Sequence, residues 1–138
     1  MHRKLKNILL VDDDHSTNLI NKMVIQKAEV ADNITIRLNG KEAMEYLSAD
    51  ALNDGLTPPD LIFLDINMPV MDGWTFLERY RGLRADQKSD IVLVMLTTSL
   101  NPDDRSRAES EPIISGFRTK PLSIEMVHDI VGDYFPSR

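Results

Sequence analysis

The stretch Ile8-Leu9-Leu10-Val11-Asp12-Asp13-Asp14 places a short apolar run directly before three aspartates. Such a run, bounded by polar residues, is typical of a strand that is buried on both faces of a sheet. Carboxylates that follow it are expected at the end of the strand. The stretch therefore predicts a central strand with acidic groups at its carboxyl end.

Four further segments have the character of strands. The segment Ile34 to Leu38 alternates between apolar and polar residues, as expected of a strand at a sheet edge or exposed on one side. The other three are apolar runs, predicted to be buried, at Leu61 to Leu64, Ile91 to Leu96 and Ile113 to Phe117.

Segments in which apolar residues recur at helical spacing separate these strands. Three sets of apolar residues are predicted to be packing faces of helices. They are Leu19, Ile20, Met23 and Val24, then Phe76, Leu77, Tyr80 and Leu83, and last Ile124, Val127, Val131 and Tyr134. A fourth helix, at about Pro102 to Glu109, has almost no apolar face beyond Ala108, so we expect it to be mobile.

Cap residues support two helix starts. Asn39 with Glu42 resembles a capping box, and Ser123 is suited to cap the last helix, with Leu122 and Val127 as a hydrophobic staple.

Strict alternation of strands and helices predicts an α/β fold, a parallel sheet with helices on both faces. A length of 138 residues suits one domain. Ligands of such folds gather at the carboxyl ends of the strands. The groups expected there are Asp12, Asp13, Asp65, Thr97 and Lys120.

Convergent carboxylates need a proton or a cation, because two unit charges about 4 Å apart repel by roughly 4 kcal/mol at an effective dielectric near 20. Oxygen ligands favour Mg²⁺, which commonly uses one or two carboxylates and a substrate phosphate. Asp65 is suited to accept a phosphoryl group, with Thr97 and Lys120 as donors to its oxygens. Asp14 is also suited to cap the following helix.

Composition excludes several classes of function. The chain has 22 Asp and Glu against 16 Lys and Arg, a formal net charge of -6, which disfavours direct binding to nucleic acid or anionic membranes. It has no Cys, so disulfides and thiolate sites are excluded. No apolar run reaches membrane-spanning length, so we expect a soluble cytoplasmic protein.

The motifs, taken in order, resemble those of a two-component receiver domain. The resemblance spans about Asn7 to Phe135. The motifs are Val11-Asp12-Asp13, Asp65-Ile66-Asn67-Met68-Pro69 with Met71-Asp72-Gly73, Leu96-Thr97 and Lys120-Pro121.

The resemblance implies a flavodoxin-like (βα)5 doubly wound sandwich, with strand order 2-1-3-4-5, and a single response regulatory domain over residues 1–138. It also implies a role for each site residue. Asp65 would be the phosphoacceptor, and Asp12, Asp13 and the backbone carbonyl of Asn67 would hold Mg²⁺ with it. Thr97 and Lys120 would contact the phosphoryl oxygens, and Thr97 and Phe117 would be the switch residues.

As implied by the resemblance, the function is that of a stand-alone, chemotaxis-regulator-like response regulator in a phosphorelay. It would not be an enzyme beyond its own phosphorylation and autodephosphorylation. A histidine kinase or histidine phosphotransfer protein would phosphorylate it. Output to an unidentified target protein, and any homodimer, would use the face made by the Pro102 to Glu109 helix, the last strand and the last helix.

Two departures and two alternatives accompany this interpretation. Thr98 stands where a smaller residue is commoner in the family, and the loop from Ser48 to Pro59 is long, with an effect on partner choice left open. A phosphorylation-independent binding module is one alternative. An aspartate-nucleophile phosphohydrolase is the other, but Asn67 stands where its second aspartate is expected.

Overall fold

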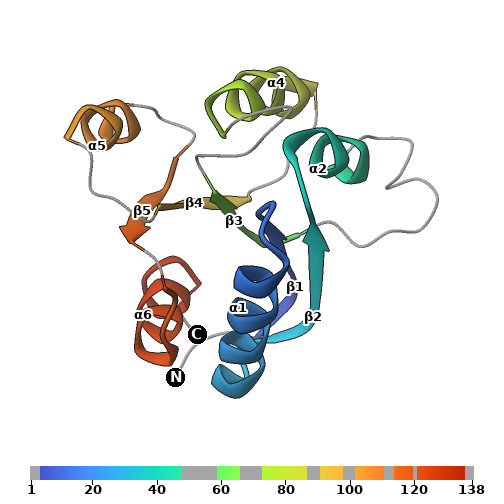
Figure 1. The fold of residues 1–138 in the computed structure, drawn as a ribbon, viewed down its shortest axis with the longest axis vertical. Coiled ribbons are helices and arrows are strands. Elements are labelled where there is room, and N and C mark those ends of the chain that lie inside the picture. The colour runs from blue at the N-terminus through green and yellow to red at the C-terminus, as the bar shows by residue number, and fades with distance from the viewer. Residues whose placement is uncertain are drawn as a thin grey trace.

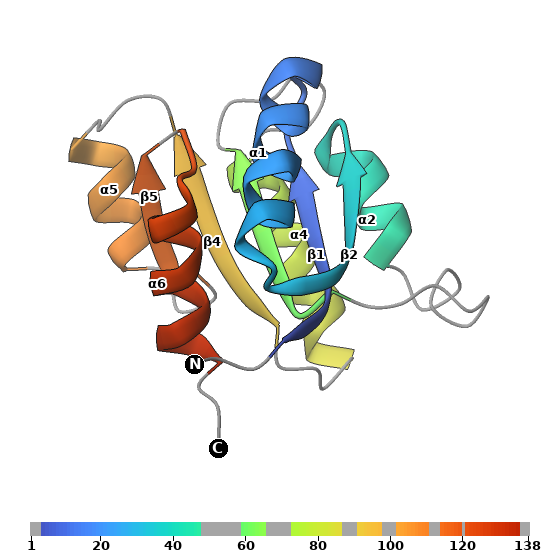
Figure 2. The same ribbon diagram turned by 90° about the horizontal axis from the view of Figure 1, so that it is seen from below.

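A single parallel sheet of five strands forms the centre of the molecule. The computed structural model describes residues 4–47, 59–65, 73–86, 91–97, 102–110, 114–119 and 121–135. The strands are β1 (Leu5–Val11), β2 (Ala31–Arg37), β3 (Leu61–Asp65), β4 (Val92–Thr97) and β5 (Gly116–Thr119), in the order β2-β1-β3-β4-β5. The expected order 2-1-3-4-5 is confirmed, and in Figure 2 all five arrows point the same way.

Helices cover both faces of the sheet. They are α1 (His15–Ala28), α2 (Gly40–Leu47), α4 (Gly73–Asp86), α5 (Pro102–Glu109) and α6 (Ile124–Tyr134). Helices α1 and α6 lie on one face, and α2, α4 and α5 lie on the other (Figure 1). The predicted doubly wound α/β sandwich is therefore correct.

The core consists of two apolar clusters, one on each face of the sheet. Beneath α2 and α4, Tyr46, Phe76 and Tyr80 pack on strand residues that face them. Beneath α1 and α6, Ile25 and Val127 pack on the opposite sides of the same strands. Successive residues of β1, β3 and β4 contribute alternately to the two clusters, which is why these strands contain the uninterrupted apolar runs Ile8–Val11, Leu61–Leu64 and Val92–Leu96.

The packing face predicted for α1 is wrong. The helix buries Asn18, Asn21, Ile25 and Ala28. It leaves Leu19, Ile20 and Met23 exposed by 60%, 53% and 48%, and only Val24 is partly buried. The physical reason lies at the start of the helix, where the connection from β1 is short. The Asn18 amide donates to the Asp12 carbonyl in this connection, and this hydrogen bond fixes the rotation of the helix.

Two other packing predictions need correction. β5 is half-buried along its length rather than buried, because it is an edge strand, and it begins at Gly116 rather than Ile113. In α6, Ile124 and Tyr134 are exposed by 39% and 36%, and Ile130 takes their place beside Val127 and Val131.

The predicted caps are confirmed. The Glu42 N–H donates to Asn39 Oδ1 at 2.8 Å, while the Glu42 carboxylate accepts from the Leu38 N–H at 3.4 Å. Ser123 caps α6 by accepting from the Met126 N–H, and Leu122 and Val127 are both buried in one cluster. The bounds of α5 agree with the prediction.

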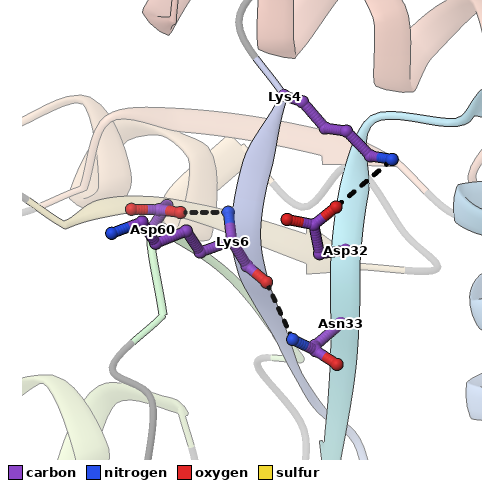
Figure 3. Close-up of polar contacts among 5 residues, drawn as sticks. All are labelled: Lys4, Lys6, Asp32, Asn33 and Asp60. Carbon is purple, nitrogen blue, oxygen red and sulfur yellow. Dashed lines mark hydrogen bonds and ion pairs between the residues drawn. The ribbon is translucent and has the colours of Figure 1, made fainter.

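Polar contacts fix the strands at the amino end of the sheet (Figure 3). The Lys6 N–H donates to Asp60 Oδ2 at 2.7 Å, and Asn33 Nδ2 donates to the Lys6 carbonyl at 3.3 Å. Lys4 pairs with Asp32 at 3.2 Å on the surface. These contacts join β1 to β2 and to the start of β3, at the end of the sheet opposite Asp12, Asp13 and Asp65.

Candidate metal centre

Strand register brings Asp12 and Asp65 together. Val11 pairs with Leu64 across β1 and β3, so the residues that follow them, Asp12 and Asp65, lie at the same level. Both are buried, with 4% and 7% of their surface exposed. These two carboxylates therefore lie at the carboxyl ends of neighbouring strands, largely shielded from solvent.

Asp13 completes an acidic triad. One carboxylate oxygen each from Asp12, Asp13 and Asp65 lies within 4.8 Å of the other two, and Asp13 is exposed to solvent. Three carboxylates this close repel one another unless a cation or proton compensates them. An oxygen-only set with one exposed member fits Mg²⁺, which retains several waters in its octahedral shell. The predicted convergence of these three residues is therefore confirmed, and the set could hold a metal ion.

Asp14 is not part of the triad. Its carboxylate accepts from the Ser16 N–H at 3.0 Å and from the Thr17 hydroxyl at 2.7 Å, and so caps α1. This is the capping role that the sequence suggested for the third aspartate. The Asp14 N–H in turn donates to Asp12 Oδ1 at 3.0 Å, which orients that carboxylate.

The structure describes only some of the remaining predicted site residues. Thr97 ends β4, one position beyond the Leu96 that pairs with Asp65, so its backbone is at the edge that carries the triad. Thr97 pairs with Thr119, which precedes Lys120 in the chain. Asn67 and Lys120 lie outside the described residues, as do Thr98 and all but the end of the Ser48 to Pro59 loop.

Phe117 lies in β5, where it is half-buried and packs against the cluster beneath α2 and α4. It lines a cavity of about 190 Å³, whose other lining residues come from α5, the segment before β5 and the start of β5. This position is compatible with core packing and with movement of the ring.

Two contacts, one of them at the site, were not found from the sequence. One is the hydrogen bond from the buried Asn18 to the Asp12 carbonyl. The other is the Arg107 guanidinium of α5, 4.2 Å from the centre of the Trp74 ring at the start of α4. A lone amide or arginine carries no sequence signal for such a contact, because the contact depends on how two elements are packed.

Comparisons with known proteins agree on one family. The model of the response regulator receiver domain matches residues 8–132. The probable methanogenesis regulatory protein FilR2 of Methanothrix harundinacea is 31% identical over 86% of this chain and 74% of its own length. The chemotaxis protein CheY of Halobacterium salinarum is 28% identical over 93% of this chain and 95% of its own.

The fold is also similar to solved structures. The crystal structure of a two-component response regulator from Cytophaga hutchinsonii superposes with a TM-score of 0.86 at 27% identity, covering 95% of this chain and 97% of that one. In the described part of the chain, no helix combines the length and the apolar character needed to cross a membrane.

Proposed function

Because this chain belongs to the response regulator receiver domain family of two-component signalling, we propose that Asp65 accepts a phosphoryl group from a phosphohistidine partner. In this reaction a carboxylate oxygen of Asp65 bonds to phosphorus, and the bond from phosphorus to the histidine nitrogen of the partner breaks. The observation that supports the proposal is the acidic triad, which places Asp65 beside two further carboxylates at a sheet edge.

Asp12, Asp13 and Asp65 would hold Mg²⁺, together with the backbone carbonyl of Asn67. When bound, the ion would neutralise charge on the transferred group and on the carboxylates around it. Asp12 is oriented by the Asp14 N–H, so its carboxylate is already directed before a ligand arrives. The Thr97 hydroxyl and the Lys120 ammonium would donate to the phosphoryl oxygens, since Thr97 is the last residue of β4 and Lys120 follows β5 in the chain.

The signal would pass from Asp65 to the face of α5, β5 and α6. Thr97 would move toward the phosphoryl group and Phe117 would rotate in response. The cavity beside Phe117 supports this proposal, because it offers space between β5 and α5. Helix α5 is suited to move, since Ala108 is its one buried residue among those whose side chains the structure describes.

The phosphodonor would dock over α1. This helix begins at the triad, and Leu19, Ile20 and Met23 form an exposed apolar patch on it. Most large apolar side chains exposed in the described part of the chain belong to this patch, the others being Ile124 and Tyr134. The donor must reach Asp65 from this edge, so an apolar helix of a histidine kinase or phosphotransfer protein is the occupant that fits.

The proposed domain organisation, location and partners of the chain follow from its family. We propose that residues 1–138 form a single receiver domain in the cytoplasm, with no nucleic acid or membrane as direct partner. The chain would catalyse only its own phosphorylation and dephosphorylation. A target protein, or a second copy of the chain, would bind the face of α5, β5 and α6.

Phosphoryl uptake tests the proposal. Purified wild type, Asp65→Asn and the control Asp32→Asn are incubated with acetyl phosphate, with and without Mg²⁺, and their intact masses are measured. We expect a Mg²⁺-dependent phosphoryl adduct on wild type and the control, and none on Asp65→Asn. An unmodified wild type would instead support the phosphorylation-independent binding module.

Docking on α1 is tested separately. Leu19→Ser with Met23→Ser should slow uptake from a phosphohistidine protein but not from acetyl phosphate, because the small donor needs no docking surface. Equal rates for wild type and variant with the protein donor would overturn the α1 assignment.

A further inference from the structure

Asn18 lies on α1, outside the acidic triad, and its side chain reaches back to the turn that carries Asp12 and Asp13. We propose that Asn18 is a positioning residue for the metal centre. The proposal rests on the Mg²⁺ site of the proposed function and adds the residue that sets its geometry.

The contact is short and buried. Asn18 Nδ2 donates to the Asp12 carbonyl at 2.8 Å, and 2% of the Asn18 surface is exposed. The Asp12 carbonyl and the Asp13 N–H belong to one planar peptide group. A bond that fixes this carbonyl therefore fixes the plane from which the Asp13 side chain leaves the backbone.

A second hydrogen bond acts on the other ligand. The Asp14 N–H holds Asp12 Oδ1 at 3.0 Å, and the Asp14 carboxylate is itself fixed at the start of α1. Helix α1 thus holds the Asp12 side chain through Asp14, and the Asp12–Asp13 peptide through Asn18. Without these contacts, repulsion within the triad would favour conformations in which the carboxylates separate.

The Asn18 amide uses only its donor group at this position. In the described part of the chain, Asn18 Oδ1 has no hydrogen-bond donor, so half of the amide is buried without a partner. Burial of such a group costs free energy, and a leucine of similar size would avoid that cost. What the leucine lacks is the donor to the Asp12 carbonyl, so the substitution isolates that one interaction.

Asn21 provides a matched control. It lies on the same helix and is equally buried, with 2% of its surface exposed. It is one turn farther from Asp12, and the described contacts of the Asp12–Asp14 turn do not include it. Asn18→Leu and Asn21→Leu therefore make the same chemical change at the same depth, on and off the ligand turn.

The experiment measures Mg²⁺ affinity without any phosphodonor, by calorimetry, on wild type and both variants of the full chain. Removal of a group that orients metal ligands typically weakens affinity by about 10-fold or more, which is the loss expected for Asn18→Leu. Asn21→Leu should keep the wild-type Kd. The phosphorylation rate of Asn18→Leu should return to the wild-type value at saturating Mg²⁺, which a general structural defect would not allow.

Equal Mg²⁺ affinities of the two leucine variants would overturn the proposal, and so would a wild type that binds no Mg²⁺. If Asn18→Leu lacks helical circular dichroism, Asn18→Ala carries the same expectation and the same criterion. A weakened Kd in a protein that takes up no phosphoryl group would support the positioning role while the proposed function fails. The experiment therefore distinguishes failure of the positioning role from failure of the proposed function.

Discussion

Removal of the charge on Asp65 should stabilise the metal-free protein. Asp65 has two carboxylate neighbours within 4.8 Å, one buried and one exposed. At that separation Coulomb's law gives about 3.5 kcal/mol of repulsion from Asp12 at an effective dielectric near 20, and about 0.9 kcal/mol from the exposed Asp13 in water. Relaxation of the folded structure and residual repulsion in the unfolded chain reduce the part of this sum that a substitution recovers. We expect Asp65→Asn to gain about 2 kcal/mol in free energy of unfolding.

Urea denaturation at low ionic strength, with EDTA, measures this gain, provided that the slope of the free energy of unfolding against urea concentration is the same for variant and wild type. A gain of about 2 kcal/mol corresponds to a rise of about 6 °C in Tm for a chain of this size. Saturating Mg²⁺ should reverse the order, because the ion stabilises the wild type by binding only its folded state.

Asp32→Asn is the control for overall charge. It removes one negative charge from an exposed residue that pairs with Lys4, so its free energy of unfolding should change by less than about 1 kcal/mol. An Asp65→Asn variant that is no more stable than wild type in EDTA would show that repulsion within the triad does not destabilise the metal-free protein. An equal gain with and without Mg²⁺ would show that the ion does not bind to this triad.

Three further predictions concern other parts of the molecule. Asp13→Asn should abolish tight Mg²⁺ binding in calorimetry without loss of stability, and an unchanged Kd would remove Asp13 from the ligand set. Tyr46→Phe should cost about 1–3 kcal/mol in urea denaturation, because it leaves the buried Asn7 amide, now 2.8 Å from the Tyr46 hydroxyl, without that acceptor. Arg107→Ala should change the fluorescence of Trp74 and cost about 0.5–1 kcal/mol, since it removes the cation–π contact between α5 and α4, and an unchanged spectrum would contradict that contact.

The sequence predicts most of the architecture because the signals are local. Runs such as Leu61–Leu64 are apolar at every position since both faces of the sheet are covered, and Ser123 caps α6 with its own side chain. The strand order did not follow from periodicity. It came from the resemblance of the motifs to a known family, and the register of the strands confirms it.

The sequence fails where tertiary contacts override a local pattern. In α1 the apolar residues Leu19, Ile20 and Met23 predict a packing face, yet Asn18 and Asn21 are buried instead. The rotation of the helix is set by the Asp14 cap and by the bond from Asn18 to Asp12. Neither feature appears in the spacing of apolar residues, which explains both the wrong packing face and the missed Asn18.

Chemical identification of the phosphorylated residue tests whether Asp65 is the phosphoacceptor. The protein is phosphorylated with acetyl phosphate and Mg²⁺ and reduced with borohydride, which converts an aspartyl phosphate to homoserine, and its peptides are then sequenced by mass spectrometry. We expect homoserine at position 65 and aspartate at positions 12, 13 and 14. Homoserine at one of those three positions, with Asp65 unmodified, would contradict this expectation.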